Sequence, residues 1–192
     1  MSSKTMERME RLIASCKRCV VVDKPFLKYE AYSWLPQKTK ILAVGESPPP
    51  GEKNSVFYNL NLFDRLRLSM KLILDIDKDL EVLKKLKKSS VFFTAAVKCR
   101  PVNQKKIQVM RVNCLPILRE EIRLLKPKKI VAMGKTASTS ITEILGLNQP
   151  KRLDRIIEAE AKNIKIFFTP HPNYIFRFKR NLTKKIKNLI EC

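Results

Sequence analysis

The sequence predicts an α/β fold, in which a short parallel sheet carries helices on both of its faces. Two observations support this prediction. Four short apolar runs have the length of buried strands, and each is followed by polar or loop-forming residues. The stretches between them carry apolar residues at helical spacing, and strands that alternate with helices are typical of parallel sheets. A hydrophobic content of 44% and only four glycines indicate a globular chain, which we expect to form one domain, residues 1–192.

The first half of the chain begins with a helix, expected over residues 5–15, where methionine and leucine recur at helical spacing. A loop-rich segment with two prolines follows over residues 20–36. The run TKILAVGES predicts a first buried strand, since it is apolar and leads into a stiff SPPPG loop. Apolar residues on one helical face then predict a helix over Asn59–Leu74, and a further helix is expected over Lys78–Lys88.

The second half repeats this alternation. Further strands are expected in the runs SVFFTAAV, KKIVAMG and IKIFFTP. Helices are expected over Ile107–Leu125, Lys135–Leu145 and Arg177–Ile190. Pro116 requires a kink or break in the first of these helices, and Gly146 closes the second.

The charge of the chain is strongly positive, with 40 Lys and Arg against 18 Asp and Glu and a net charge of +22. Such an excess favours a polyanionic partner, above all nucleic acid. A Lys-rich solvated surface of the hyperthermophile kind is an alternative, although it would normally balance Lys with Glu. An anionic membrane is a weaker alternative, because no helix combines a wide apolar face with anchoring signals. The apolar runs are too short to span a bilayer and no signal peptide is visible, so we expect an intracellular protein.

The cysteines suggest a metal centre. Cys16 and Cys19 form a C-x2-C pair, and fourteen residues separate Cys99 from Cys114. Two close and two distant thiols suit either a tetrathiolate zinc site or an iron–sulfur cluster. The second pair lacks the tight spacing of zinc ribbons, which favours the cluster. Buried cysteines without any ligand are the remaining alternative.

The ends of the predicted strands carry the unusual residues, and ligands of open α/β sheets bind beyond the carboxyl ends of the strands. Glu46 follows the first strand, and His171, the only histidine of the chain, follows the fourth. Proline on either side of His171 restricts its backbone. A structural histidine and a capping glutamate are the alternatives for these two residues. Phe57 and Tyr58, after the proline-rich loop, either pack in the core or stack on a base.

Several motifs, taken together, resemble those of the uracil-DNA glycosylase superfamily, and most closely its iron–sulfur (family 4-like) branch. The matching pieces span nearly the whole chain: Cys16-x2-Cys19, GES-P at 45–49, VKCRP at 97–101, Cys114, KPKKIVAMGKTA at 126–137 and TPHPNYIFR at 169–177. The resemblance implies a three-layer αβα sandwich around a four-stranded parallel sheet. It also implies a structural [4Fe–4S] cluster held by Cys16, Cys19, Cys99 and Cys114.

The resemblance further implies a DNA glycosylase that flips a nucleotide out of DNA and hydrolyses its N-glycosidic bond. His171 would donate a hydrogen bond to the departing base, Glu46 would stabilise the sugar cation or orient water, and Phe57 would stack on the base. Further base contacts are expected from Gly45, Ser47, Thr94 and Asn54. Contacts to DNA are expected from Lys98, Arg100, Lys135, Asn173, Tyr174, Ile175, Phe176 and Arg177, of which residues 174–176 form an apolar wedge.

One position departs from the branch. Ala95 stands where its members carry an asparagine that reads uracil, and Thr94 and Asn54 are the candidates to replace that amide. We therefore expect a glycosylase for a deaminated base, uracil first among them, with hypoxanthine as another substrate. A non-catalytic iron–sulfur DNA-binding protein and a small zinc-containing basic adaptor are the alternatives. DNA is the expected partner of a monomer located in the cytoplasm with the nucleoid, away from membranes.

Overall fold

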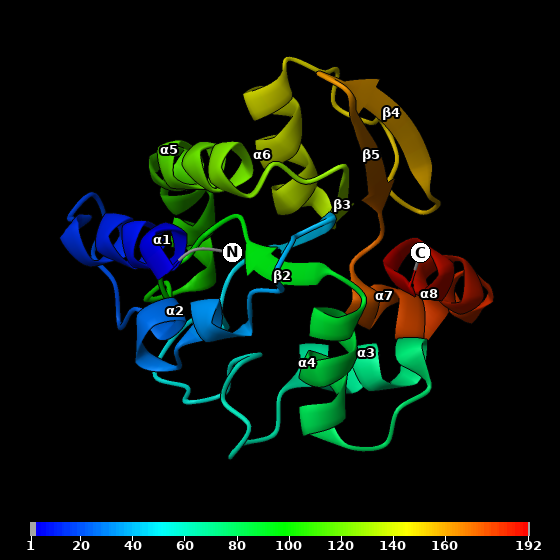
Figure 1. Ribbon diagram of the computed structural model, residues 1–192, viewed down its shortest axis with the longest axis horizontal. Helices are drawn as coiled ribbons and strands as arrows, with labels where there is room; N and C mark the ends of the chain where they lie inside the picture. Colours follow the sequence, from blue (N-terminus) through cyan, green and yellow to red (C-terminus); the bar gives the residue numbers. More distant parts are fainter. Residues whose placement is uncertain (1–2, 192) are drawn as a thin grey trace.

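The structure, a computed structural model, describes residues 3–191, so Cys192 lies outside it (Figure 1). Its centre is a five-stranded sheet in the order β2-β1-β3-β5-β4. Four strands run parallel, and β4 pairs antiparallel with β5 at one edge. The strands are β1 (Ile41–Gly45), β2 (Val91–Ala95), β3 (Lys129–Met133), β4 (Ile157–Ala161) and β5 (Ile164–Thr169).

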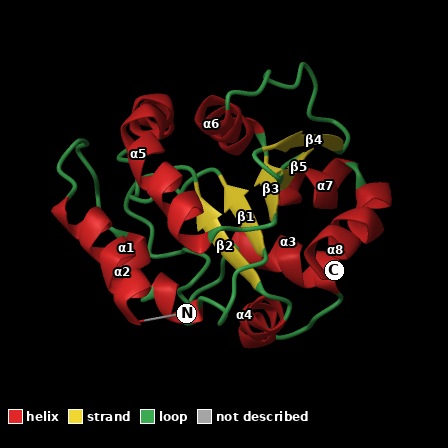
Figure 2. Cartoon of the chain, turned by 45° about the horizontal axis from the view of Figure 1, so that its top comes forward, coloured by secondary structure: helices red, strands yellow, loops and turns green. Residues whose placement is uncertain are grey.

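Helices cover both faces of this sheet, with α5 and α6 on one side and α3, α4 and α8 on the other (Figure 2). The helices are α1 (Ser3–Ser15), α2 (Pro25–Lys28), α3 (Arg65–Leu74), α4 (Asp79–Lys88), α5 (Ile107–Leu125), α6 (Lys135–Leu145), α7 (Pro172–Phe178) and α8 (Thr183–Glu191). Short 3-10 turns lie at Ala31–Trp34, Gln104–Lys106 and Arg180–Leu182. The predicted α/β class with its αβα layers is confirmed.

The sheet has one strand more than predicted. β4 has the sequence IEAEA, in which half-buried apolar residues alternate with exposed glutamates, as suits an edge strand with one solvated face. A tight turn joins it to β5, and both turn residues, Lys162 and Asn163, have positive φ angles of 52° and 60°. Positive φ at both central positions is the geometry of a type I′ hairpin turn.

Two helices differ from their predicted extent. α3 begins only at Arg65, because the side chain of Asp64 caps it by accepting a hydrogen bond from Arg67 N at 2.8 Å. The basic final helix is divided into α7 and α8, with a 3-10 turn between them. Pro116 does not break α5, which continues through it from Ile107 to Leu125.

The central strands are buried along their whole length, since helices cover both faces. Gly45 ends β1 beneath an aromatic ring, and a Cβ atom there would lie 2.9 Å from Phe93 Cζ. Any larger residue at this position would require the Phe93 ring to move. No helix among residues 3–191 has the length and apolar character needed to cross a membrane.

Candidate active site

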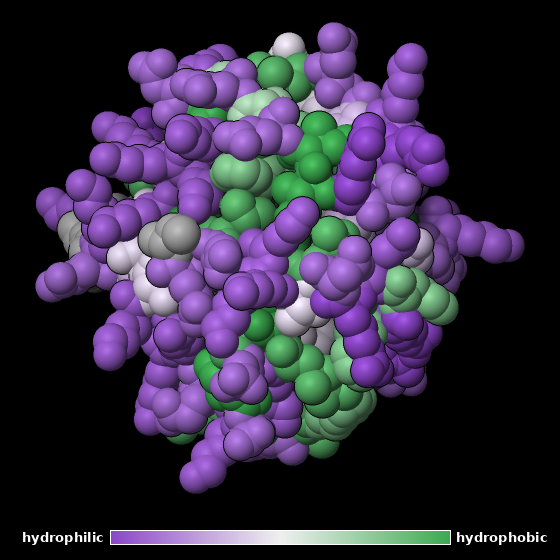
Figure 3. Space-filling model, turned by 90° about the vertical axis from the view of Figure 1, so that its right-hand side faces the viewer, coloured by the Kyte–Doolittle hydropathy of each residue, from purple (hydrophilic) through white to green (hydrophobic). Residues whose placement is uncertain are grey.

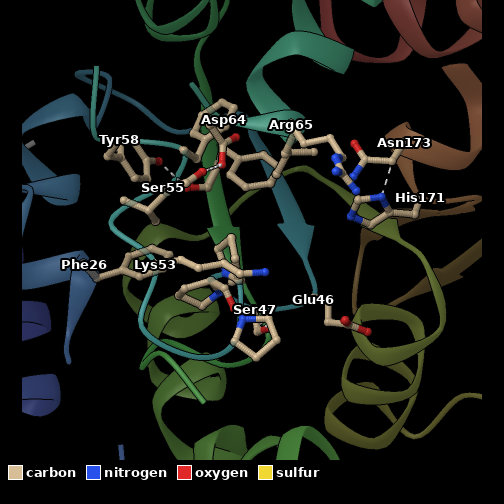
Figure 4. A pocket seen from close by; sticks show the side chains of 18 of the residues that line it. Phe26, Glu46, Ser47, Lys53, Ser55, Tyr58, Asp64, Arg65, His171 and Asn173 are labelled. Atoms are coloured by element: carbon tan, nitrogen blue, oxygen red, sulfur yellow. Dashed lines mark hydrogen bonds between the residues drawn. The ribbon is translucent and has the colours of Figure 1, made fainter. Parts of the chain in front are cut away.

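A cavity of about 550 Å³ lies beyond the carboxyl ends of β1 and β2 (Figure 4). The loop after β1 forms one wall with Glu46 and Ser47, and the start of α7 forms another with His171 and Asn173. Ala95, at the end of β2, contributes to the lining. The cavity thus occupies the position at which open α/β sheets bind their ligands.

Glu46 is held in place by two neutral donors. Thr136 Oγ1, in the first turn of α6, donates to Glu46 Oε2 at 2.6 Å, and Gln104 Nε2 donates to Oε1 at 3.3 Å. No lysine or arginine among the described residues forms an ion pair with this carboxylate. Its negative charge is therefore oriented but not neutralised by the protein, which suits stabilisation of a nearby cation or proton transfer from water.

His171 is the N-cap of α7, where its Nδ1 accepts a hydrogen bond from Asn173 N at 3.2 Å. Burial lowers the pKa of His171, and the negative charges of Glu46 and Asp64 oppose this shift in part. A neutral ring whose Nδ1 is an acceptor carries its proton on Nε2. Gly134 allows the ring to approach, since a Cβ there would lie 3.3 Å from His171 Cβ. His171 is thus a neutral hydrogen-bond donor at the cavity.

Aromatic side chains form the apolar part of the cavity. The ring of Phe57 lies on Phe93 with centroids 4.5 Å apart and meets Tyr58 edge-on. The fully buried Arg67 holds this loop, because its guanidinium donates to the carbonyl oxygens of Val56, Phe57, Asn59 and Leu62. Four main-chain contacts from one side chain fix the position of Phe57 at the cavity wall.

The predicted base contacts lie in different places. Ser47 lines the cavity, and its hydroxyl donates to Pro48 O at 2.9 Å. Thr94 is fully buried and bonded to Glu121, so its side chain does not reach the cavity. Asn54 is exposed and absent from the lining. Burial therefore contradicts the expected base contact of Thr94, and neither Asn54 nor Gly45, which packs against Phe93, contributes to the cavity lining.

Lys98 and Arg100 correct the prediction of phosphate contacts at the end of β2. Both side chains are fully buried. Lys98 Nζ lies 2.5 Å from Glu121 Oε2 and donates to Ala95 O at 2.7 Å. Arg100 Nε lies 2.8 Å from Asp23 Oδ1, and its guanidinium also donates to Pro49 O and Ser55 O. Buried and paired in this way, neither side chain can contact the DNA backbone.

The predicted wedge is only partly on the surface. Ile175 is fully buried in the core, which contradicts its expected contact with DNA, and Phe176 is half-buried beneath the guanidinium of Arg180. Tyr174 is 40% exposed and lies beside the 66% exposed Phe178, with ring centroids 5.2 Å apart. The exposed aromatic pair of α7 is therefore Tyr174 and Phe178, and sequence reasoning missed the second.

Basic side chains surround this region. A second hollow, a groove of about 770 Å³, also has His171 in its lining, together with Lys135, Lys151 and Tyr174. Arg177 is exposed on α7, whereas Asn173 is half-buried and its Oδ1 accepts a hydrogen bond from Ser69 Oγ. Figure 3 shows the side of the molecule with α7, α8 and the β4–β5 hairpin, where hydrophilic side chains surround a band of hydrophobic atoms.

Comparison with known proteins agrees with this geometry. The model of the uracil DNA glycosylase superfamily matches residues 32–191, most of the chain. The chain belongs to the uracil-DNA glycosylase superfamily. A type-4 uracil-DNA glycosylase of Pyrobaculum aerophilum is 25% identical over 188 residues, covering 90% of this chain and 85% of the relative. A type-4 enzyme of Sulfurisphaera tokodaii is 27% identical (88% and 74% covered), and a type-5 enzyme of Pyrobaculum aerophilum is 24% identical (84% and 79% covered).

The four cysteines of this superfamily member lie close enough together to interact electrostatically. Burial raises the pKa of Cys99 to about 12, and the neighbouring Cys114, Cys16 and Cys19 add to the shift. Burial likewise raises the pKa of Cys114. None of the four forms a disulfide, and Asn113 Nδ2 donates to Cys19 Sγ at 3.2 Å. Within residues 3–191, no group of three or more His, Cys, Asp or Glu side chains is arranged to hold a metal ion.

Several cavity residues of this superfamily member were not predicted from the sequence. Arg65, Asp64, Ser55 and Gln104 all line the cavity but belong to loops and helix starts without a periodic pattern. Asp64 alone carried a usable signal, because an aspartate before an apolar helical face is a typical N-cap.

Proposed function

We propose that this chain is a monofunctional DNA N-glycosylase that removes a deaminated base, with uracil as the first substrate, in base excision repair. The observation that carries the proposal is the cavity that holds an unpaired, oriented carboxylate on Glu46 and a neutral imidazole donor on His171. The names of the relatives, type-4 and type-5 uracil-DNA glycosylase, support the same reaction.

The reaction would divide its charges between these two residues. The bond between C1′ and the base nitrogen breaks, and both electrons leave with the base. Glu46 stabilises the resulting sugar cation and takes a proton from the water whose oxygen bonds to C1′. The Nε2–H of His171 donates a hydrogen bond to the carbonyl oxygen of the anionic base and keeps its proton. The released base later takes a proton from solvent.

The remaining residues would hold the DNA. Phe57 stacks on the flipped base, because it forms a rigid aromatic wall of the cavity. Tyr174 and Phe178 offer exposed rings to fill the vacated space in the duplex. Lys135, Lys151 and Arg177 provide positive charge for the phosphates. We expect the chain to do this as a monomer, on nucleoid DNA in the cytoplasm.

We also propose that Cys16, Cys19, Cys99 and Cys114 hold a [4Fe–4S] cluster. An all-sulfur donor set drawn from three segments fits such a group, and buried thiols need a positive partner to become thiolates. The cluster would stabilise the fold by joining these segments and would take no part in redox chemistry. These cysteines would then tie the 16–19 loop and α5 to the segment after β2, from which Arg100 reaches the loop walls of the cavity. Iron and sulfide analysis of protein purified without oxygen tests this, and one equivalent of zinc alone would contradict it.

A second candidate function is DNA binding without cleavage. Ala95 favours it, because neither Thr94 nor Asn54 reaches the cavity to replace the missing amide. A pocket without that amide loses part of its selectivity for uracil.

An alkaline-cleavage assay separates the two functions. Labelled oligonucleotides would carry one uracil, hypoxanthine or xanthine, in single-stranded, matched and mismatched contexts. We expect strand breaks at uracil that fall sharply in Glu46→Ala and His171→Ala while DNA binding persists, with Glu158→Ala on the β4 edge as control. DNA binding by wild-type protein without any strand break would support the second candidate.

A further inference from the structure

The cavity contains a cation that the reaction described above does not use. Arg65, the first residue of α3, lines the cavity with an exposed side chain. Figure 4 shows that this side chain extends from α3 toward Asn173 and His171. No carboxylate of residues 3–191 forms an ion pair with it.

The neighbouring aspartate does not neutralise Arg65. Asp64 Oδ1 accepts the hydrogen bond from Arg67 N that caps α3, and Oδ2 accepts one from Ser55 Oγ at 3.2 Å. Both carboxylate oxygens of Asp64 thus accept hydrogen bonds from groups other than the Arg65 guanidinium. The guanidinium of Arg65 remains as a full positive charge at the cavity.

One hydrogen bond between α3 and α7 links the helix start that carries Arg65 to the helix start that carries His171. Ser69, one turn after Arg65 on α3, donates to Asn173 Oδ1 at 2.8 Å. The main chain of Asn173 in turn donates to His171 Nδ1. The start of α3 and the start of α7 are therefore linked, and Arg65 and His171, at these two helix starts, line the same cavity.

We propose that Arg65 is a catalytic residue that stabilises the negative charge of the departing base together with His171. This inference rests on the proposed glycosylase function and adds a second group to it. A neutral imidazole donates one hydrogen bond, whereas a guanidinium adds a full charge and several N–H donors at the cavity. The alternative role for a cation here is a contact to a phosphate of the flipped nucleotide.

Leaving-group ability separates these two roles. 5-Fluorouracil forms a more stable anion than uracil, so its release needs less help from a cation near the base. A phosphate contact, in contrast, is the same for both bases and weakens binding uniformly. Single-turnover rates on single-stranded oligonucleotides with either base would be compared for wild type, Arg65→Gln and Arg65→Lys, with Arg119→Gln on the outer side of α5 as control.

We expect Arg65→Gln to lose roughly 100-fold in rate on uracil, the usual effect of removing one such donor, and clearly less on 5-fluorouracil. Arg65→Lys should recover part of the loss, and Arg119→Gln should resemble wild type. Thermal unfolding of each variant confirms that it is folded. An equal loss on both bases, with a salt slope of DNA binding reduced by about 1, would make Arg65 a phosphate contact and overturn the inference.

Two other results would distinguish a failure of this inference from a failure of the proposed function. Full activity of Arg65→Gln beside an active wild type would overturn the inference alone. Wild-type protein that releases neither base would overturn the proposed function, and the role of Arg65 with it.

Discussion

The imidazole of His171 works as a donor only while it is neutral. Its Nδ1 accepts a main-chain hydrogen bond, and a protonated ring would have to give up that bond because both of its nitrogens would be donors. Burial is the largest cause of its lowered pKa. The environment of this residue therefore protects the form that the proposed reaction needs.

We expect the single-turnover rate of base release to stay constant as the pH falls from neutral to the ordinary imidazole pKa of 6.5. Since the pKa in the folded protein lies below that value, the rate should decline only at still lower pH, where the ring gains a proton. The pH profile of His171→Gln is the control and should lack this inflection. An inflection above pH 6.5 would contradict the assignment.

Lys98 and Glu121 form a fully buried ion pair under the cavity floor. Thr94 and Tyr32 donate further hydrogen bonds to Glu121, and burial followed by the charge of Glu121 raises the pKa of Tyr32 well above its ordinary value. Lys98 Nζ also binds the carbonyl oxygen of Ala95, a residue of the cavity lining. The pair thus connects the core to the base pocket.

Removing one partner should be more damaging than removing both. We expect Lys98→Met to lower the free energy of unfolding by about 3–5 kcal/mol, because it leaves an uncompensated buried carboxylate. The double variant Lys98→Met with Glu121→Gln should recover a large part of that loss. Urea unfolding without oxygen measures both, and additive losses would contradict the coupling.

Among the elements, the β4–β5 hairpin has a turn whose residues do not suit its geometry. Lys162 and Asn163 both adopt positive φ, and a lysine in this conformation is strained. Asparagine followed by glycine is the preferred pair for a type I′ turn.

We expect the double variant Lys162→Asn with Asn163→Gly to raise the free energy of unfolding by about 1 kcal/mol and the Tm by about 2–4 °C. The hairpin turn lies at the opposite ends of the strands from the cavity, so base release should not change. Calorimetry beside the activity assay measures both effects, and a lower Tm would show that the turn is not strained.

The sequence predicts those strands that consist of a mainly apolar run of residues. The strands β1, β2 and β3 are predictable because their apolar runs reflect a sheet covered on both faces, and β5 is predictable because its run is mainly apolar although Lys165 is exposed. β4 was not predicted, because its five residues include two glutamates and resemble a loop. Only the antiparallel pairing with β5 identifies this segment as a strand. The start of α3 is set by a side-chain cap rather than by hydrophobic spacing.

The site follows a similar rule. Glu46 and His171 are predictable because their place at strand ends depends on the backbone alone. Lys98 and Arg100 occupy a comparable position, yet their side chains turn inward to Glu121 and Asp23, a choice that spacing does not reveal. Arg65 reaches the cavity only through the packing of α3 on α7, which no local pattern encodes.

The whole molecule carries a net charge of +22 and few acidic groups to balance it. Binding of DNA by such a surface releases condensed counterions, so affinity should depend steeply on salt. The buried pairs of Lys98 and Arg100 remove these two side chains from that interaction.

We expect log affinity for an undamaged oligonucleotide to fall linearly with log salt. If about six phosphates are neutralised, the loss between 50 and 200 mM salt is roughly 10³-fold. The double variant Lys135→Gln with Lys151→Gln should reduce the slope of log affinity against log salt. The variant Lys84→Gln, on the outer side of α4, should change that slope by less than the loss of one phosphate contact would. Fluorescence anisotropy across a salt series measures this, and an affinity independent of salt would contradict a phosphate-binding surface.

The single imidazole of the chain also makes its catalytic state directly observable. Because His171 is the only histidine, its two ring nitrogens give the only imidazole resonances in a ¹⁵N spectrum, with no need for assignment. Their chemical shifts show which nitrogen signal is protonated, and the couplings to the two ring-carbon protons show whether that nitrogen is Nε2 or Nδ1. The tautomer is set by the first turn of α7, so any fraying of that short helix would appear as exchange between the two forms, and the readiness of the proposed site could be followed in the free protein before any DNA is added.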